Sequence, residues 1–237
     1  MLRAVELSRK GWPAPNPRVG CVLVKNDRLI AEGWHHAAGG PHAEAAALAV
    51  AAGRAEGATA YVTLEPCSHF GRTPPCAQAL ISAGVSRVVY GVPDPNPTAS
   101  GGAEVLKRAG IEVSCGTGRQ EAILANKWWL YSRFAGRPAV ILKAAVTKDG
   151  FMARLDGSSK WITSPESREI GHRLRAEMGA VLTGWRTVAV DQPLLTARID
   201  GVVNQPKRVI LDPHARLSGG EAVLQGEEAI WVNSLES

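Results

Sequence analysis

The chain has 237 residues and a mass of 25.1 kDa, with 45% hydrophobic residues, 27 basic residues, 22 acidic residues and a formal net charge of +5. This composition is that of a soluble globular protein, and it excludes the disordered and fibrous classes. No run of about 18 apolar residues occurs and no signal-peptide core is visible, so we expect a cytoplasmic protein without a membrane partner. Basic residues are nowhere dense enough for a nucleic-acid footprint, so no nucleic-acid partner is expected.

Alternating strands and helices are predicted along residues 1–136. Two β-rich runs on either side of Lys25-Asn26-Asp27 indicate a hairpin. Helix boundaries are marked by prolines before the first turn and glycines after the last. In chain order we predict strands at 19–24 and 28–34, a helix over 42–53, a strand at 58–64, a helix over 74–84, a strand at 85–92, a helix over 101–110, a strand at 111–115 and a helix that continues into 126–134. This order favours an α/β sandwich around a mixed sheet.

A second α/β region is predicted from Arg137 onward, which divides the chain into domains at 1–136 and 137–237. The second region is short for a parallel sheet covered on both faces. We therefore expect exposed strand edges that favour a homodimer. The predicted elements are a strand at 138–146, a helix from Ser164 to about Met178, and strands at 180–185, 207–212 and 228–232.

Three residues of metal-binding type occur at the predicted ends of helices and strands. His42 opens an Ala-rich helix, Cys67 directly follows a strand, and Cys76 begins the next helix. Two thiolates and one imidazole leave a fourth position for water, which is the pattern of a catalytic zinc site. Helix N-termini also favour the thiolate form of cysteine. We therefore predict that these three residues bind Zn²⁺.

Glu44 lies two residues after His42 and need not be a ligand, so we predict that it shuttles a proton from water to a leaving amine. The alternatives are a structural zinc site with His69 as the fourth ligand, or buried thiols without a metal. Cys21 and Cys115 lie in apolar predicted strands and are expected to be core thiols.

The order His-x-Glu, then Pro-Cys and a second Cys, is the signature of zinc nucleobase deaminases, here with eight residues rather than two between the cysteines. The segment TLEPCSHFGRTPPC, together with NPRVGCVLV, GWHHAAGGPHAE, DPNP, KAAVTKDGFMA and SSKWITSP, resembles the bifunctional deaminase/reductase family of riboflavin biosynthesis. The resemblance implies a three-layer α/β/α cytidine-deaminase-like domain followed by a dihydrofolate-reductase-like α/β domain. Because the family's Glu-Gly-Gly tripeptide does not occur, we expect the reductase domain to be truncated and its activity to be doubtful.

For the deaminase, the resemblance implies a phosphorylated pyrimidine as substrate. His69 and Arg72 suit the phosphorylated end of this substrate. Asn16, Asp94 and Asn96 precede or flank prolines, so they can equally well be ordinary turn residues without a role in binding. The implied substrate contacts are Asn16, His35, His69, Arg72, Asp94 and Asn96.

For the second domain, the resemblance implies an NADPH-dependent reduction of the ribose of the deaminated product to ribitol. Arg175 and Arg198 suit a phosphate, and Trp161 suits stacking. The implied cofactor contacts are Ala145, Trp161, Thr187 and Asp191, and the implied substrate contacts are Lys143, Ser159, Arg175, Leu195 and Arg198.

Our leading hypothesis is a zinc hydrolase that deaminates a phosphoribosylated diaminopyrimidinone to the aminouracil ribotide and ammonia. A cytidine, guanine or tRNA-adenosine deaminase is the first alternative, although the long segment between the cysteines argues against it. A non-catalytic zinc-binding scaffold is the second.

Overall fold

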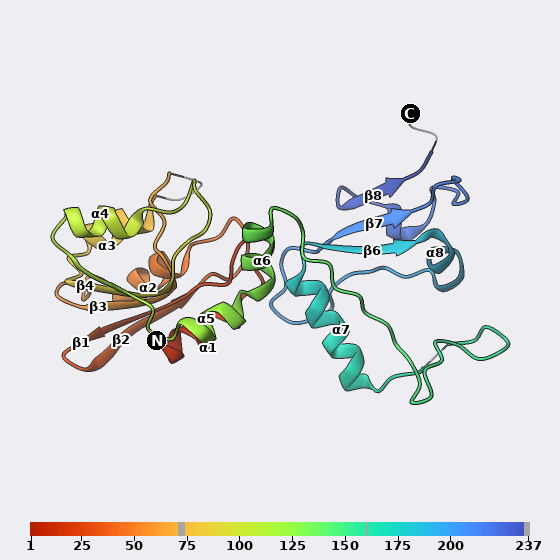
Figure 1. The fold of residues 1–237 in the computed structure, drawn as a ribbon, viewed down its shortest axis with the longest axis horizontal. Helices are drawn as coiled ribbons and strands as arrows, with labels where there is room; N and C mark the ends of the chain where they lie inside the picture. Colours follow the sequence, from red (N-terminus) through yellow and green to blue (C-terminus); the bar gives the residue numbers. More distant parts are fainter. Residues whose placement is uncertain (71–73, 160, 235–237) are drawn as a thin grey trace. The chain divides into compact units, whose positions relative to one another are not determined.

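The computed structural model of the chain describes residues 1–70, 74–159 and 161–234. The chain divides into two compact units, Met1–Ala139 and Val140–Ser237, and each unit has a sheet of its own (Figure 1). Among the described residues, no helix has the length and apolar character needed to cross a membrane.

The first unit is built on a five-stranded sheet in the order β2-β1-β3-β4-β5. β1 pairs antiparallel with β2 and β3, whereas β3, β4 and β5 run parallel. The strands are β1 (Gly20–Lys25), β2 (Arg28–Trp34), β3 (Thr59–Leu64), β4 (Arg87–Val92) and β5 (Glu112–Cys115). The helices are α1 (Leu2–Ser8), α2 (Ala43–Ala51), α3 (Cys76–Ser82), α4 (Gly102–Arg108), α5 (Arg119–Ala125) and α6 (Lys127–Ala135).

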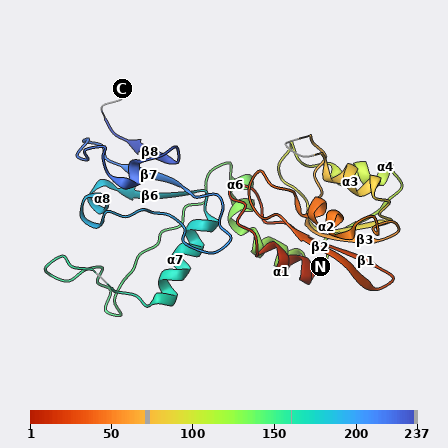
Figure 2. The same cartoon turned by 180° about the vertical axis from the view of Figure 1, so that it is seen from behind.

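Helices cover both faces of this sheet, as seen from either side (Figures 1 and 2). Successive side chains of a strand point to opposite faces, so Cys21 and Leu23 of β1 pack in the core cluster that includes Ala47 of α2. Val22, between them, packs with Leu7 of α1 on the other face. The first unit is therefore a three-layer α/β/α sandwich, as predicted.

The predicted hairpin forms, and Asn26 and Asp27 have φ values of 50° and 56°. Two positive φ angles in a two-residue loop are the requirement of a type I′ turn. Helix α1 was not predicted. The thiol of Cys21 is fully buried, but Cys115 is exposed because it ends the edge strand β5, so the prediction of a core thiol is wrong for Cys115.

Asn126 interrupts the helix that was predicted to continue into 126–134. α5 ends at Ala125 and α6 begins at Lys127, and the backbone of Asn126 is not helical, with φ −122° and ψ 20°. The backbone N–H of Arg18 donates to Asn126 Oδ1 over 2.8 Å, and Asn126 Nδ2 donates to the Arg18 carbonyl over 2.7 Å. A single continuous helix is therefore the wrong prediction, because the side chain of Asn126 bonds a distant backbone segment.

The second unit has a three-stranded parallel sheet in the order β6-β7-β8. Val188, Ile210 and Val223 lie in the buried cluster of this unit. Side chains such as Leu182 and Ile230 are exposed by 61% and 41%. The elements are α7 (Pro165–Glu177), β6 (Ala180–Gly184), α8 (Trp185–Asp191), β7 (Lys207–Leu211), a 3₁₀ helix η1 (Ala222–Leu224) and β8 (Ala229–Val232).

Residues 138–146 were predicted to be a strand but are irregular in the structure. Val140 and Leu142 are 84% and 94% exposed. A strand forms only where its backbone N–H and C=O groups pair with a neighbouring strand. Within the described part of the second unit, the sheet consists of β6, β7 and β8 alone. The prediction is therefore wrong, since an apolar sequence does not by itself supply a partner.

Candidate metal centre

The three predicted ligands lie at the carboxyl end of β3 and at the beginnings of α2 and α3. Cys67 follows β3 after Glu65 and Pro66, His42 immediately precedes α2, and Cys76 is the first residue of α3. Ligands in open α/β sheets generally bind beyond the carboxyl ends of the parallel strands. The sheet therefore brings together residues that are far apart in sequence.

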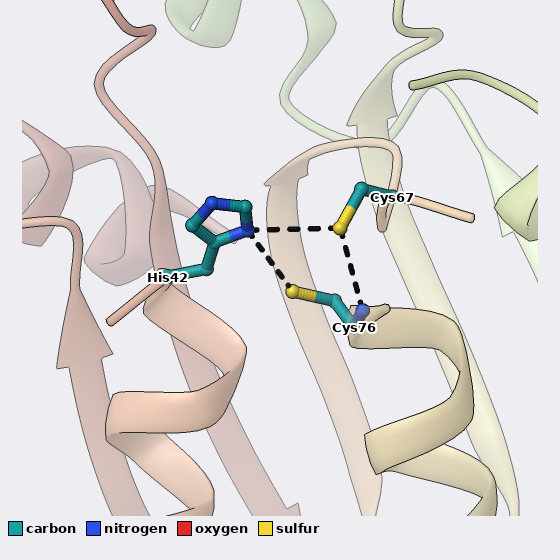
Figure 3. A group of neighbouring side chains, drawn as sticks. All are labelled: His42, Cys67 and Cys76. Carbon is teal, nitrogen blue, oxygen red and sulfur yellow. Dashed lines mark hydrogen bonds between the residues drawn. The ribbon is translucent and has the colours of Figure 1, made fainter. Parts of the chain in front are cut away.

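The side chains of His42, Cys67 and Cys76 converge on one point (Figure 3). His42 Nδ1 lies 3.6 Å from Cys67 Sγ and 3.3 Å from Cys76 Sγ, and the backbone N–H of Cys76 donates to Cys67 Sγ over 3.3 Å. All three ligand atoms lie within 4.8 Å of one another. Among the described residues His69 is not part of this group, so three protein ligands leave one tetrahedral position open.

The electrostatics of these side chains suit zinc. The hydrogen bond between the two thiol side chains lowers the pKa of Cys67, and the same bond, together with burial, raises the pKa of Cys76. The hydrogen bond with Cys67 also raises the pKa of His42. One sulfur is thus already stabilised as a thiolate, and an imidazole with two sulfurs is a donor set that zinc prefers. The residues present therefore fit the metal.

Glu44 is buried in the first turn of α2, where only 3% of its surface is exposed. Burial, followed by the negative charge of Cys67, raises the pKa of this carboxyl to about 7. A group with a pKa near the working pH can both accept and donate a proton. A carboxyl with this pKa suits the proton transfer predicted for Glu44, which stays a prediction.

His35 lies beside the ligand His42, and Asn16 lies against His35. His35 Nδ1 is 2.9 Å from the Pro41 carbonyl, so this nitrogen carries the proton, and His35 Nε2 can accept from Asn16 Nδ2 at 3.3 Å. Burial lowers the pKa of His35, which favours the neutral form of the ring. Its ring lies edge-on to that of His42, with centroids 5.3 Å apart. The structure thus connects Asn16 to the ligand His42 through His35, and their contact with a substrate stays a prediction.

Glu65 is a residue of this site that the sequence analysis missed. Its Oε1 accepts from the backbone N–H groups of Gly101 and Ala103 over 3.1 Å each, and its Oε2 accepts from the N–H of Asp94 over 3.2 Å. Asp94 Oδ1 in turn accepts from the N–H of Asn96 over 2.8 Å. Glu65 therefore ties the loop of Asp94 and Asn96 to the segment that carries Cys67. The sequence signal that could have identified Glu65 is its position directly before Pro66-Cys67, at the end of the predicted strand.

Of the two residues assigned to the phosphorylated end of the substrate, Arg72 lies outside the described residues. His69 is half-buried, and its Nδ1 is buried without a hydrogen-bond partner among the described residues. A buried polar atom of this kind is costly unless a ligand or water satisfies it.

In the second unit, Arg175 and Arg198 meet at one side chain that was not predicted, His172. Arg175 Nη1 lies 3.4 Å from His172 Nδ1, and Arg198 Nη2 lies 3.3 Å from His172 Nε2. The carbonyl of Thr196 accepts from Arg175 Nη1 over 3.3 Å. Two guanidinium groups so close together form a candidate anion site.

The other predicted residues of the second unit belong to several different elements. Trp161 is 75% exposed and lies under the guanidinium of Arg168, whereas Leu195 is buried in the core. Thr187 and Asp191 belong to α8, and the remaining positions, Lys143, Ala145 and Ser159, belong to the irregular segment 140–159.

Comparison with known proteins matches each part of the chain to a family. Residues 1–92 match the cytidine and deoxycytidylate deaminase zinc-binding region, and residues 138–237 match the RibD C-terminal domain. These matches confirm a cytidine-deaminase-like domain followed by a reductase-type domain, for which the family's cofactor is NADPH.

Relatives match over nearly the whole chain. Riboflavin biosynthesis protein RibD of Aquifex aeolicus is 51% identical over 93% of this chain and 62% of its own length, and that of Escherichia coli is 44% identical over 98% and 67%. A Thermotoga maritima structure, named as a diaminohydroxyphosphoribosylaminopyrimidine deaminase and 5-amino-6-(5-phosphoribosylamino)uracil reductase, matches with a TM-score of 0.86 and 43% identity, over 98% of this chain and 68% of that one. The chain thus spans roughly two thirds of the length of these relatives. It belongs to the RibD family of riboflavin biosynthesis proteins.

Proposed function

We propose that the first unit is a zinc-dependent deaminase of riboflavin biosynthesis, which works in the cytoplasm on a phosphoribosylated diaminopyrimidinone. The products are the aminouracil ribotide and ammonia. The name of the Thermotoga relative includes this activity, which supports the same substrate class here. The observation that carries the proposal is the buried carboxyl of Glu44 next to the convergent His42, Cys67 and Cys76.

In the proposed mechanism, His42, Cys67 and Cys76 are the ligands, and the zinc they hold supplies Lewis acidity that lowers the pKa of a water molecule toward neutrality. Glu44 accepts a proton from this attacking water at a carboxylate oxygen. It then donates the proton to the leaving amine, so that the water oxygen replaces the exocyclic nitrogen and ammonia departs. Glu44 ends in the state in which it began, and its pKa of about 7 suits both transfers.

The substrate contacts of the deaminase are part of the same proposal. His35 lies edge-on to the ligand His42 and contacts Asn16, and Glu65 bonds the loop of Asp94 and Asn96 to the segment that carries Cys67. We assign the pyrimidine and ribose to these four residues, and the phosphate to His69 and Arg72. A cytidine, guanine or tRNA-adenosine substrate is less well supported, because RibD relatives match along nearly the whole chain.

For residues 137–237 we propose a reductase-type domain whose Arg175 and Arg198 bind the phosphate of the ribotide. Of the proposed cofactor positions, Trp161 is exposed, Ala145 lies in an irregular segment, and Thr187 and Asp191 lie on α8, so no contact among the described residues joins them into one NADPH site. We therefore derive no hydride-transfer step for this unit. Oxidation of NADPH by the purified protein in the presence of the aminouracil ribotide would contradict this assignment.

A single pair of variants tests the deaminase. Glu44→Gln should keep its zinc, measured by metal analysis, while ammonia release from the ribotide falls by about 10²–10⁴-fold. The exposed Glu56→Gln is the matched control and should release ammonia at the wild-type rate. Full activity of zinc-loaded Glu44→Gln would refute the proposed role of Glu44, and ammonia release only from cytidine, guanine or tRNA would refute the proposed substrate. Absence of ammonia release from all of them would support the scaffold alternative.

A further inference from the structure

We propose that Asn126 is a positioning residue of the deaminase site, which acts by holding the segment that carries Asn16. This inference rests on the function proposed above for the first unit. Asn126 lies between α5 and α6, far along the chain from the metal ligands, and only 6% of its surface is exposed. Neither the family signature nor the metal geometry assigns it a role.

Both polar ends of the Asn126 side chain bond to the same residue. Its Oδ1 accepts from the backbone N–H of Arg18 over 2.8 Å, and its Nδ2 donates to the carbonyl of Arg18 over 2.7 Å. This two-way bond fixes both the position and the orientation of the Arg18 backbone, as a neighbouring strand would. It also settles which end of the amide carries oxygen, because an N–H must face an acceptor and a carbonyl must face a donor.

The contact is not a helix cap. Asn126 immediately precedes α6, where an asparagine side chain commonly accepts from an N–H of the first turn, yet its side chain makes no such bond. The break between α5 and α6 instead falls at the residue whose side chain bonds the backbone of Arg18. A purely local role would leave this pairing unexplained.

A short and stiff segment connects Arg18 to the site. Pro17 has a fixed φ and also restricts the backbone of Asn16 before it. Few backbone torsions are therefore free to absorb a displacement of Arg18, and Asn16 would move with it. The N–H of Asn16 donates to the Pro13 carbonyl over 2.8 Å, and its side chain reaches His35 Nε2 at 3.3 Å. The Asn16 segment is thus held by Asn126 at one end and by His35, beside the metal ligand His42, at the other.

Asn126→Asp tests this arrangement with the smallest change. The variant keeps the oxygen that accepts from Arg18 but places a second oxygen against the Arg18 carbonyl, and aspartate is well tolerated at the start of a helix. We expect the KM for the ribotide to rise about tenfold, which corresponds to about 1.4 kcal/mol of lost substrate binding, with zinc content and kcat close to wild type. Lys127→Gln makes the same change of net charge at the exposed next position and should leave the KM unchanged.

A double-mutant cycle distinguishes positioning from general destabilisation. If Asn126 acts through Asn16, the Asn126→Asp change should have little further effect on kcat/KM in an Asn16→Ala background. An equal loss in both backgrounds would overturn the inference, as would a wild-type KM in Asn126→Asp. If thermal unfolding shows that Asn126→Asp does not fold, Asn126→Ser, which removes the two-way bond without adding a charge, is carried through the same cycle. A wild-type protein that releases no ammonia would refute the proposed function and this inference together, whereas an active wild type with additive variants refutes the inference alone.

Discussion

Burial of Glu44 should make the metal-free protein less stable than it would be with a neutral side chain at this position. The pKa of Glu44 is about 7 in the fold and 4.5 in its ordinary state. At about 1.4 kcal/mol for each pH unit between these values, ionisation of the buried carboxyl costs the folded state about 3 kcal/mol. Glu44→Gln should remove that cost, because glutamine has nearly the same shape and no charge.

The sign of the pH dependence follows from proton binding. Between pH 4.5 and 7 the folded chain holds the Glu44 proton more tightly than the unfolded chain does, so the free energy of unfolding falls as the pH rises through this window. Above the window the full cost is present, and below it there is none. The stabilisation by Glu44→Gln should therefore be about 3 kcal/mol at pH 8 and close to zero near pH 4.

Urea unfolding of chelator-treated protein, followed by circular dichroism at both pH values, measures this difference. Only the transition of the first unit should move, and the exposed Glu56→Gln should shift it by less than about 0.5 kcal/mol at either pH. A Glu44→Gln protein that is no more stable than wild type at pH 8 would refute the reasoning. A gain of equal size at both pH values would refute it as well, since packing rather than charge would then be its source.

Three further outcomes are expected. Burial alone would raise the pKa of Asp212, but hydrogen bonds from the N–H groups of Arg216 and Leu217 and from the Trp231 indole hold this pKa below its ordinary value. Asp212→Asn should therefore lower the urea midpoint for unfolding of the second unit at pH 7. The loss of stability should shrink as the pH falls through 4, because the wild-type carboxylate then becomes protonated. Gly102→Ala would push a Cβ against the Pro66 carbonyl oxygen, so we expect a loss of about 1–3 kcal/mol of stability in urea and weaker zinc retention against a chelator; a wild-type zinc affinity would contradict this. Glu65→Gln turns an N–H toward backbone donors and should raise the KM for the ribotide more than it lowers kcat, with zinc content unchanged; a fall in kcat alone would count against its assignment to the loop of Asp94.

The metal centre was predictable because local signals mark the elements that carry its ligands. His42 opens a helix that stops near Gly53, and Pro74-Pro75 precede the helix that begins with Cys76. Both signals depend on backbone preferences of single residues, which act over one or two turns. The order of these elements along the chain then fixes which ends meet at the edge of a parallel sheet.

The contacts that hold the loops of the site have no such local signal. Asn126 bonds Arg18, Glu65 bonds backbone groups of Gly101 and Ala103, and His172 bonds Arg198. Each pair joins segments that only the folded topology brings together, so neither hydrophobic periodicity nor motif spacing in the sequence predicts the contact. The same reason explains the error at 138–146, where apolar composition indicated a strand but pairing depends on a partner elsewhere in the chain.

The alanines of α2 show how composition, packing and site geometry are connected. In the sequence they indicate high helix propensity, but in the structure Ala43, Ala47 and Ala51 are also fully buried against the sheet. Gly33 of β2 lies opposite, so close to the Ala47 N–H and the Ala43 carbonyl that it has no room for a Cβ. Larger side chains on either element would move α2 away from β2, and with it His42 at the beginning of the helix. The 3.3 Å and 3.6 Å separations between His42 Nδ1 and the two sulfurs are therefore set by small residues that never contact the metal.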